Sequence, residues 1–125
     1  MKWFYALCFT LFTLLCGISS HASAEDKTIT IAAKILDPVT AETRATKYEE
    51  PLDATLKEAK VGEVTGGGNS VGKGGKIEWA GVDIEVTDVQ KAVPLIKQKL
   101  VELGAPKGSS LEYRVGAKRV VVPVQ

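Results

Sequence analysis

The sequence has few of the residues that most often carry out chemistry. Its 125 residues include two cysteines, one histidine and one methionine, and all four lie within the first 24 positions. Beyond residue 24, no Cys–His or Ser–His catalytic pair, no zinc site of the usual kind and no haem ligation can be built, so we expect no cofactor and no metal. Carboxylates, lysine and tyrosine could still act as acids or bases, but their spacing singles out no catalytic pair.

The N-terminal segment has the features of an export signal. Lys2 gives it a positive start, residues 4–16 form an apolar run too short to span a membrane as a helix, and the small residues Ala-Ser-Ala come just before Glu25. We therefore predict a signal peptide over residues 1–24, cut between Ala24 and Glu25, and export to the periplasm or the medium.

A lipid anchor on Cys16 is the alternative outcome of the same signal. Acylation of a cysteine requires a small residue just before it, and Leu15 occupies that position. This favours a soluble exported protein with no stable membrane anchor after cleavage.

Once the leader is removed, neither sign of charge dominates. Fifteen basic residues face fifteen acidic ones, which argues against nucleic acid or an anionic membrane as partner. Only three aromatic residues are left, Trp79, Tyr48 and Tyr113. The chain can build one modest core, without disulfides. We predict Trp79 as its large core residue and Tyr48 as a hydrophobic staple onto Leu52 or Thr55.

Residues 76–86 predict the long strand around which the rest of the domain is organised. Apolar and polar side chains alternate along it, as in a half-buried strand. Ile77 and Trp79 have one parity, whereas the apolar residues after Gly81 have the other. All of them point into one core only if an extra residue is inserted, so we predict a β-bulge at Ala80–Gly81.

A helix is expected directly after this strand. Thr87 and Gln90 fit a capping box at its start, and Gly104 fits a left-handed cap at its end. Pro94 should bend its first turns. Its apolar stripe consists of Val89, Ala92, Val93, Ile96, Leu100 and Leu103. A return strand over residues 111–115 and an edge strand over residues 119–124, which contains Pro123, complete the chain.

The first half predicts a strand over residues 28–35, an exposed polar loop over residues 37–47, a short helix from Pro51 and a short strand over residues 61–65. The apolar face of the short helix is Leu52, Leu56 and Ala59. The element order is then β-α-β-β-α-β with an extra C-terminal edge strand. We expect a single α+β domain over residues 25–125, a ferredoxin-like sandwich of one sheet and two helices.

A glycine-rich loop is predicted over residues 66–75. From Gly67 it nearly spells a phosphate-binding motif, but Gly74 replaces the Ser or Thr that binds magnesium, and a strand follows instead of a helix. A flexible hairpin connection therefore explains the glycines better than a nucleotide site. The loop remains a candidate for contact with a partner, through Gly66, Gly67, Gly68, Asn69 and Lys73.

Glu78, Asp83 and Glu85 form the one group of carboxylates that suggests calcium binding or acid–base chemistry. All three fall on outward positions of the predicted strand, where acidic residues commonly serve solubility. We interpret them as a solvated sheet face.

Three short runs together resemble small bacterial ferredoxin-like proteins, most of them uncharacterised. They are Tyr-Glu-Glu-Pro-Leu at residues 48–52, the triple glycine at residues 66–68, and Leu-Gly-Ala-Pro-Lys-Gly at residues 103–108 ahead of Leu-Glu-Tyr at residues 111–113. The resemblance covers roughly residues 28–115 and implies the fold. Some domains of this general kind are immunity proteins that neutralise a toxin, but the resemblance brings no active-site residues with it.

Three hypotheses about function follow. The first is an exported, non-enzymatic protein-binding domain, in particular a periplasmic immunity protein. The second is a protease inhibitor or propeptide-like chaperone that offers residues 120–124 as an edge strand. The third is a small enzyme with a pocket beside Glu63, Lys73 or Tyr113.

Overall fold

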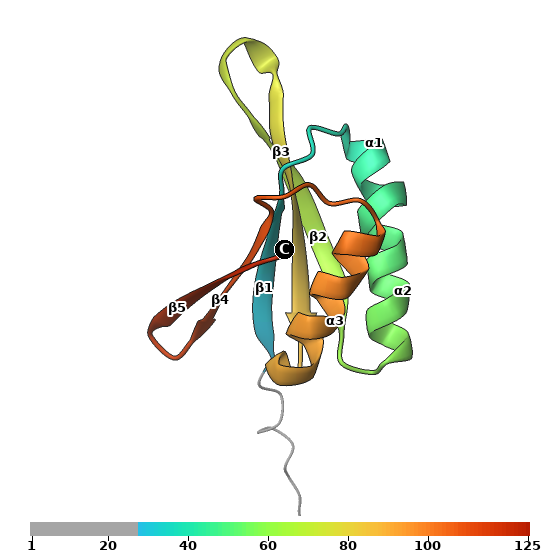
Figure 1. Cartoon of the computed structure of the whole chain (residues 1–125), viewed down its shortest axis with the longest axis vertical. Helices are drawn as coiled ribbons and strands as arrows, with labels where there is room; N and C mark the ends of the chain where they lie inside the picture. The colour runs from blue at the N-terminus through green and yellow to red at the C-terminus, as the bar shows by residue number, and fades with distance from the viewer. Residues whose placement is uncertain (1–27) are drawn as a thin grey trace, which may run out of the picture.

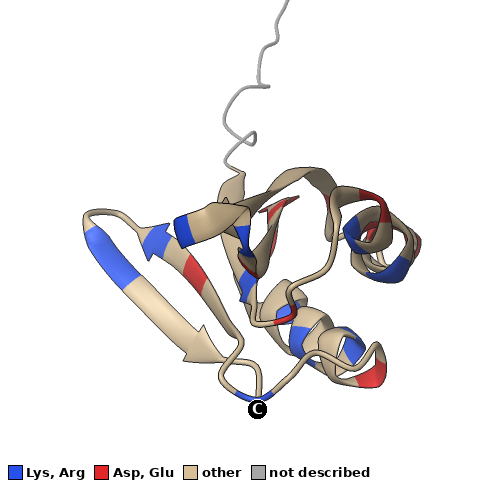
Figure 2. Cartoon of the chain, turned by 90° about the horizontal axis from the view of Figure 1, so that it is seen from above, with Lys and Arg blue, Asp and Glu red and all other residues tan. Residues whose placement is uncertain are grey.

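The computed structural model of the chain describes residues 28–125. The predicted leader, its cleavage site between Ala24 and Glu25, and Cys16 lie outside the described residues. Within this part the chain forms one five-stranded antiparallel sheet with its helices packed on one face (Figures 1 and 2). Between residues 28 and 125 there is no helix with the length and apolar character needed to cross a membrane.

The elements follow the expected order, with some bounds that differ. They are β1 (Ile29–Ile35), α1 (Ala41–Arg44), η2 (Ala45–Glu49), α2 (Glu50–Glu58), β2 (Gly62–Val71), η3 (Lys73–Gly75), β3 (Ile77–Val86), α3 (Val89–Glu102), β4 (Ser110–Val115) and β5 (Lys118–Pro123). The strands lie in the order β2-β3-β1-β4-β5, so β5 is an edge strand as predicted. The predicted α+β class is confirmed, and this order is compatible with a ferredoxin-like arrangement.

The core forms between the helices and one face of the central strands. Ile31, Ile35 and Val82 are among the strand residues that are fully buried, and β1 pairs with β3 without interruption from Ile29 to Ile35. Helix α3 buries the stripe that its period predicts, led by Ile96 and Leu100. Each large aliphatic side chain removed from water in this way contributes about 1.5–3 kcal/mol to folding.

The predicted β-bulge at Ala80–Gly81 is wrong. β3 keeps a continuous register with β1 over this stretch. The register shifts occur in the β2–β3 ladder instead, where Glu78 of β3 and Thr65 of β2 are the extra, unpaired residues. The prediction placed Trp79 in the core, which required a change of parity. Ala80 takes the core position instead, so the face that begins there continues unbroken to Val86.

The predicted exposed loop over residues 37–47 is wrong from Ala41 on, where the chain is helical, although no residue of this stretch is buried. The Thr40 hydroxyl caps this helix by accepting the Thr43 N–H at 3.2 Å. A π-helical turn, η2, leads into α2, whose first turn contains Pro51, the residue that the sequence had placed at a helix start. Proline lacks an N–H and crowds the carbonyl four residues before it, and a wider turn accommodates both effects.

The glycine-rich loop is shorter than predicted. β2 continues to Val71 and pairs with β3, so only η3 and its flanks form the connection, with Gly74 and Gly75 at a φ of 77°. Glycine is typical of loops, but strand pairing uses backbone groups that glycine also has. The predicted short strand over residues 61–65 is therefore the first half of a long one.

Two helix ends differ in detail from the sequence prediction. The cap of α3 is Asp88, whose carboxylate accepts the Lys91 N–H at 3.2 Å, rather than Thr87. Gly104 turns the chain after α3 at a φ of 91°, as predicted. Helix α2 buries Leu52 and Leu56, but Ala59 is exposed because the helix ends at Glu58.

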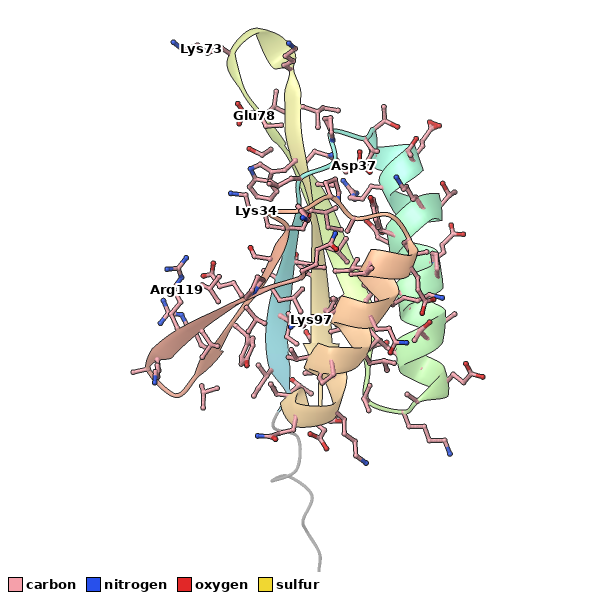
Figure 3. The ribbon with its side chains drawn as sticks, viewed as in Figure 1. Lys34, Asp37, Lys73, Glu78, Lys97 and Arg119 are labelled. Atoms are coloured by element: carbon pink, nitrogen blue, oxygen red, sulfur yellow. The ribbon has the colours of Figure 1, made fainter. Side chains whose placement is uncertain are left out.

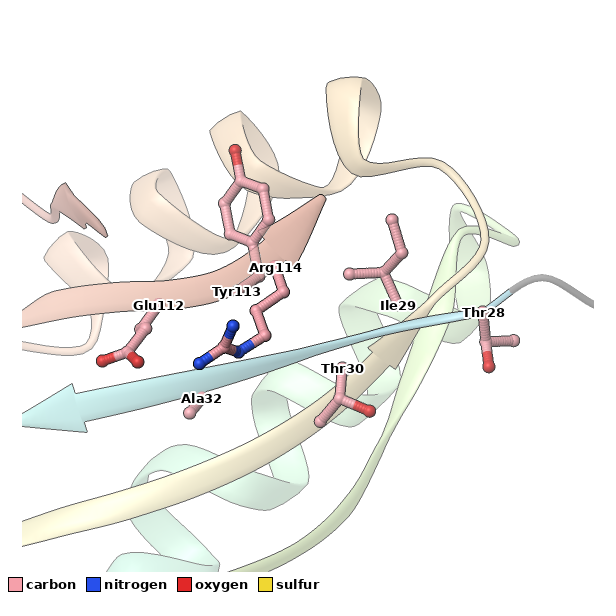
Figure 4. A pocket seen from close by; sticks show the side chains of 7 residues that line it. All are labelled: Thr28, Ile29, Thr30, Ala32, Glu112, Tyr113 and Arg114. Carbon is pink, nitrogen blue, oxygen red and sulfur yellow. The ribbon is translucent and has the colours of Figure 1, made fainter. Parts of the chain in front are cut away.

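The β4–β5 hairpin stands away from the rest of the sheet (Figures 1 and 2). β4 pairs with β1 only at residues 32–34 of β1. From Ala32 towards the start of β1, the two strands diverge. We call the space between them the β1–β4 wedge. It is a hollow of about 370 Å³ lined by Thr28, Ile29, Thr30, Ala32, Glu112, Tyr113 and Arg114 (Figure 4).

Candidate functional site

The face of the sheet opposite the helices has no element of the described chain packed on it (Figure 2). We call this surface the open face. It consists of the outward residues of β1, β3 and β4, namely Thr30, Ala32, Lys34, Trp79, Gly81, Asp83, Glu85, Ser110, Glu112 and Arg114. Most of these side chains are polar and suit water. Trp79 is the exception, because it is large, apolar and only half-buried.

Trp79 is on the open face and not in the core, so its predicted role was wrong. The Lys34 ammonium lies over its indole ring, 5.0 Å from the ring centroid. A contact of this kind contributes about 0.5–1 kcal/mol at an exposed site. The pair therefore fixes the indole beside a cation on a surface that solvent reaches.

Glycine makes room for the indole on the sheet. A side-chain Cβ at Gly81 would lie 3.2 Å from Cζ3 of Trp79 and 3.5 Å from the carbonyl oxygen of Gly68. The ring thus lies close over backbone that a larger residue would cover. The residues that surround the ring on the sheet include Gly68, Gly81 and Ala32. Their small side chains leave a depression beside Trp79.

The open face is hollowed on both sides of Trp79. One hollow of about 320 Å³ lies towards β4, between Lys34, Trp79 and Glu112, and another of about 280 Å³ lies towards β2, beside Gly68. The first shares Ala32 and Glu112 with the β1–β4 wedge. A shallow depression therefore crosses the sheet from the β4–β5 hairpin to β2. Lys34 lines this depression, and Figure 3 labels it together with Arg119 on the β4–β5 hairpin.

The predicted contact residues of the glycine-rich segment do not all lie on one surface. Asn69 faces the helix, where its amide donates to the Val39 carbonyl at 2.8 Å and its oxygen accepts from Arg44. Gly67 faces the same way: a Cβ there would lie 2.6 Å from Oε2 of Glu49, which pairs with Arg44 at 2.5 Å.

The other three members of that set are free of this network. Cβ atoms added at Gly66 and Gly68 would meet no atom within 4 Å, and Lys73 projects at the tip of the β2–β3 hairpin (Figure 3). Gly68 lines the hollow beside Trp79, and Gly67 and Asn69 also border it, so three of the five predicted residues adjoin the open-face site.

Tyr48 has a structural role that differs from the predicted staple. It lies inside the helix and not at its start, its ring is fully buried, and its hydroxyl donates to Oδ2 of Asp37 at 2.6 Å. Burial and the Asp37 bond raise the pKa of Tyr48. Burial raises the pKa of Asp37, but hydrogen bonds from Lys47 and Tyr48 outweigh it and lower the pKa overall. The cluster ties η2 to the chain just after β1.

The three carboxylates interpreted as a solvated sheet face are all accessible to solvent, but they do not lie together. Asp83 and Glu85 lie on the open face, whereas Glu78 is the extra residue at the bulge near the β2–β3 hairpin (Figure 3). Across residues 28–125, no group of three or more His, Cys, Asp or Glu side chains is placed to hold a metal.

The residues proposed for an enzyme also lie apart. Glu63 is in β2, Lys73 is in the η3 turn and Tyr113 is in β4, and the hollow lined by Tyr113 includes neither of the others. No acid–base pair is therefore formed among these three.

The open-face site was missed because the sequence supplies only a weak signal for it. Trp79 shares its parity with Gly81, Asp83 and Glu85, a series of outward residues, and the signal is this parity. The sequence prediction placed Trp79 in the core because its side chain is large and apolar, in spite of this parity.

No known protein family, curated protein or solved structure matches the chain. The resemblance to small bacterial ferredoxin-like proteins, some of them immunity proteins, therefore stays a prediction.

Proposed function

We propose that this chain is an exported, non-enzymatic protein-binding domain that engages its partner through the open face. The half-exposed Trp79, held by Lys34 beside a shallow hollow, is the observation that carries the proposal. Tryptophan is enriched among the residues that dominate protein–protein binding energy. The mixture of one apolar anchor with surrounding charged and polar side chains matches the composition of a non-obligate interface.

The same proposal extends to the finer description of the fold. We assign the chain to ferredoxin-like β-α-β-β-α-β sandwiches, with β5 as an addition at the edge beside β4. The strand order β2-β3-β1-β4 and the antiparallel pairings support it. In such a sandwich both helices cover one sheet face and leave the other for binding.

Toxin neutralisation is the form of protein binding that the resemblance implies. An immunity protein binds one partner tightly and protects the cell that exports it. Co-expression with the product of a neighbouring toxin-like gene should restore growth. Absence of both binding and protection would exclude this role while leaving protein binding itself in place.

A protease inhibitor or propeptide-like chaperone is the second candidate, favoured by the position of β5 at the sheet edge. Its outward residue Val121 is 49 % exposed, but Val124 is buried and its N–H donates to the Ser109 carbonyl. Truncation would therefore disturb the core. Inhibition of a panel of secreted proteases that disappears in Val121→Arg would support this candidate, and no inhibition by the unaltered protein would exclude it.

The proposed function is tested by partner retention. The protein is recovered from the soluble exported fraction of a Gram-negative host, immobilised and exposed to lysate of the organism that encodes it. We expect one stoichiometric protein to be retained, and Lys34→Glu and Trp79→Ala to lose it. Lys91→Glu, on the exposed side of α3, is the matched control that should retain it. Equal retention by all four proteins would contradict binding through the open face.

A further inference from the structure

Among residues 28–125, three stretches of strand edge are covered by no neighbouring strand: the outer edge of β2, the outer edge of β5, and the facing edges of β1 and β4 in the β1–β4 wedge. Unpaired N–H and C=O groups along an edge are a template for an added strand. Folded proteins block such edges with side chains, charges or proline. The three edges differ in whether they are blocked in this way.

The outer edge of β2 is occupied by side chains from the helix. The Val64 N–H donates to Oδ1 of Asp53 at 2.9 Å. Further along, Asn69 is bonded to Arg44 and to the Val39 carbonyl. An added strand would have to displace these bonds.

The outer edge of β5 is protected by its own sequence. The Val124 N–H bonds to the Ser109 carbonyl on the β4 side, so the alternate residues Arg119, Val121 and Pro123 face outward. Pro123 has no N–H to donate. Lys118 and Arg119 bring positive charge to the same short strand. Proline and basic residues are the usual means of blocking an edge.

The β1 side of the wedge has no such protection. The Leu36 N–H donates to the Ser109 hydroxyl at 3.0 Å, on the β4 side of β1. Since backbone groups alternate in direction along a strand, those of Thr28 and Thr30 also point towards β4. The ladder between the strands stops at Ala32, so no described strand pairs with either threonine on that side.

The β4 side of the wedge is unpaired in the same way. The Ser109 carbonyl accepts a bond on the β5 side, so Arg114, of opposite parity, points its backbone groups towards β1. The wedge is thus an opening between two strand edges that face each other. Its volume of about 370 Å³ lies within the range of about 300–1,000 Å³ typical of ligand sites.

The side chains around the wedge indicate what enters it. Ile29 and Tyr113 pack partly against the core at its inner side, which suits apolar residues at alternate positions of an added strand. On the open face Glu112 is paired with Arg119 at 2.7 Å, whereas Arg114 has no salt-bridge partner among residues 28–125. A carboxylate on the added strand would give Arg114 a partner.

We propose that the β1–β4 wedge takes up an extended segment of the partner protein by strand addition, with alternating apolar residues towards Ile29 and Tyr113 and a carboxylate beside Arg114. This rests on the proposed protein-binding function and specifies how part of the partner is held. About five residues suffice to reach from Ala32 past Thr28, and the backbone groups of Thr28, Thr30 and Arg114 supply the hydrogen bonds. A second copy fits less well, because its edge strand β5 would bring Lys118 and Arg119 against Arg114.

The test uses peptides selected from a random seven-residue phage library on the purified protein, then synthesised with blocked ends. We expect them to alternate apolar and polar residues and to include Asp or Glu. At saturation, amide hydrogen exchange measured by NMR should slow roughly tenfold or more at Thr28, Thr30 and Arg114. The amides of Arg119 and Val121 should be unchanged. Protection of these two instead would place strand addition at β5 and overturn the proposal.

Two variants separate binding from folding. Thr30→Pro removes an N–H that has no strand partner, so it should leave the fold intact and abolish peptide binding, whereas Arg114→Glu should weaken acidic peptides roughly fivefold and favour lysine-containing ones. Unfolding of Thr30→Pro would mean that this N–H is already bonded in the free protein. Unchanged binding of acidic peptides by Arg114→Glu would mean that no carboxylate of the added strand pairs with Arg114. Either result would contradict the proposal.

One outcome separates the failure of strand addition from the failure of the proposed protein-binding function, and two more would overturn strand addition. A natural partner that is retained through Trp79 but leaves the wedge amides unprotected would disprove strand addition and leave protein binding standing. Failure of the wild-type protein to enrich any sequence, or protection of the wedge that appears only as a dimer forms, would also overturn the proposal.

Discussion

Gly67 is a point of close packing between β2, the helix and β3. A Cβ there would lie 2.6 Å from Oε2 of Glu49 and 2.7 Å from the backbone oxygen of Gly81, which cannot move as a side chain can. Gly67→Ala should therefore lower the free energy of unfolding by about 1–3 kcal/mol, the usual cost of forcing extra volume into packed structure. Urea denaturation measures this directly.

Gly66→Ala is the matched control, because its added Cβ meets no atom within 4 Å. We expect its free energy of unfolding to stay within about 0.5 kcal/mol of the wild-type value. Equal losses in the two variants would mean that flexibility, and not space, explains the glycines of β2.

Asp37 should make stability depend on acid. Its folded-state pKa is below the ordinary value of 3.8, since the hydrogen bonds from Lys47 and Tyr48 outweigh burial. As the pH falls, the unfolded chain binds the proton first. The stability contributed by this carboxylate is therefore complete above about pH 4 and is lost as the pH falls through the folded-state pKa.

Asp37→Asn tests this dependence. The variant should be less stable than wild type at pH 7, and the difference in unfolding free energy should narrow at pH 3 and below. Urea denaturation across this range gives both curves. Parallel curves would show that other carboxylates account for all of the acid sensitivity.

At the residue scale, the sequence was more informative about position than about role. The alternation of β1 and β3 predicted which aliphatic residues are buried, and burial agrees for Ile31, Val82 and Ile84. Trp79 was misplaced because size and hydrophobicity favour the core. Only the contact with Lys34 and the space over Gly81 explain how the indole is held on the open face, and neither follows from sequence spacing.

At the element scale, the cap of α3 offers a clear comparison. The Asp88 carboxylate accepts the Lys91 N–H, so Asp88→Ala should cost about 1 kcal/mol of unfolding free energy. The Thr87 hydroxyl makes a single 3.3 Å bond to the Val61 carbonyl, and Thr87→Ala should cost less. Thermal denaturation of the two variants ranks them. A larger loss of stability in Thr87→Ala than in Asp88→Ala would instead support the capping box predicted from Thr87 and Gln90.

The helix over residues 41–58 shows why some elements escape sequence prediction. Between Ala41 and Glu49 only Tyr48 is buried, and one apolar residue gives no period to detect. Pro51 then suggested a start where the helix in fact continues through a π-turn. The long strand β2 was missed for a related reason, since its pairing depends on backbone groups that its composition does not reveal.

At the scale of the whole molecule, the order of the elements and the α+β class followed from the sequence, because α2, α3 and the central strands have clear periods. The open face could not be predicted as a site, since it depends on which residues of three strands lie side by side. The wedge is further from sequence still. It exists because β4 diverges from β1 beyond the Ala32–Glu112 pair, and no residue type in the sequence signals that divergence.

Removal of the leader is a prediction at this scale with a direct readout. Mass spectrometry of the protein from the exported fraction should give a chain that begins at Glu25. A product that keeps residues 1–24 would contradict export by signal cleavage, and a product acylated at Cys16 would establish the lipid anchor instead.

Binding through the open face is tested most directly by fluorine NMR of the exported protein labelled with 5-fluorotryptophan. Trp3 is predicted to leave with the signal peptide, so Trp79 should give a single resonance. Addition of unlabelled retained partner should shift or broaden that resonance, while the Lys34→Glu protein, with its indole intact, should respond only at much higher partner concentrations. A partner that binds stoichiometrically and leaves the Trp79 resonance unchanged would contradict binding through the open face.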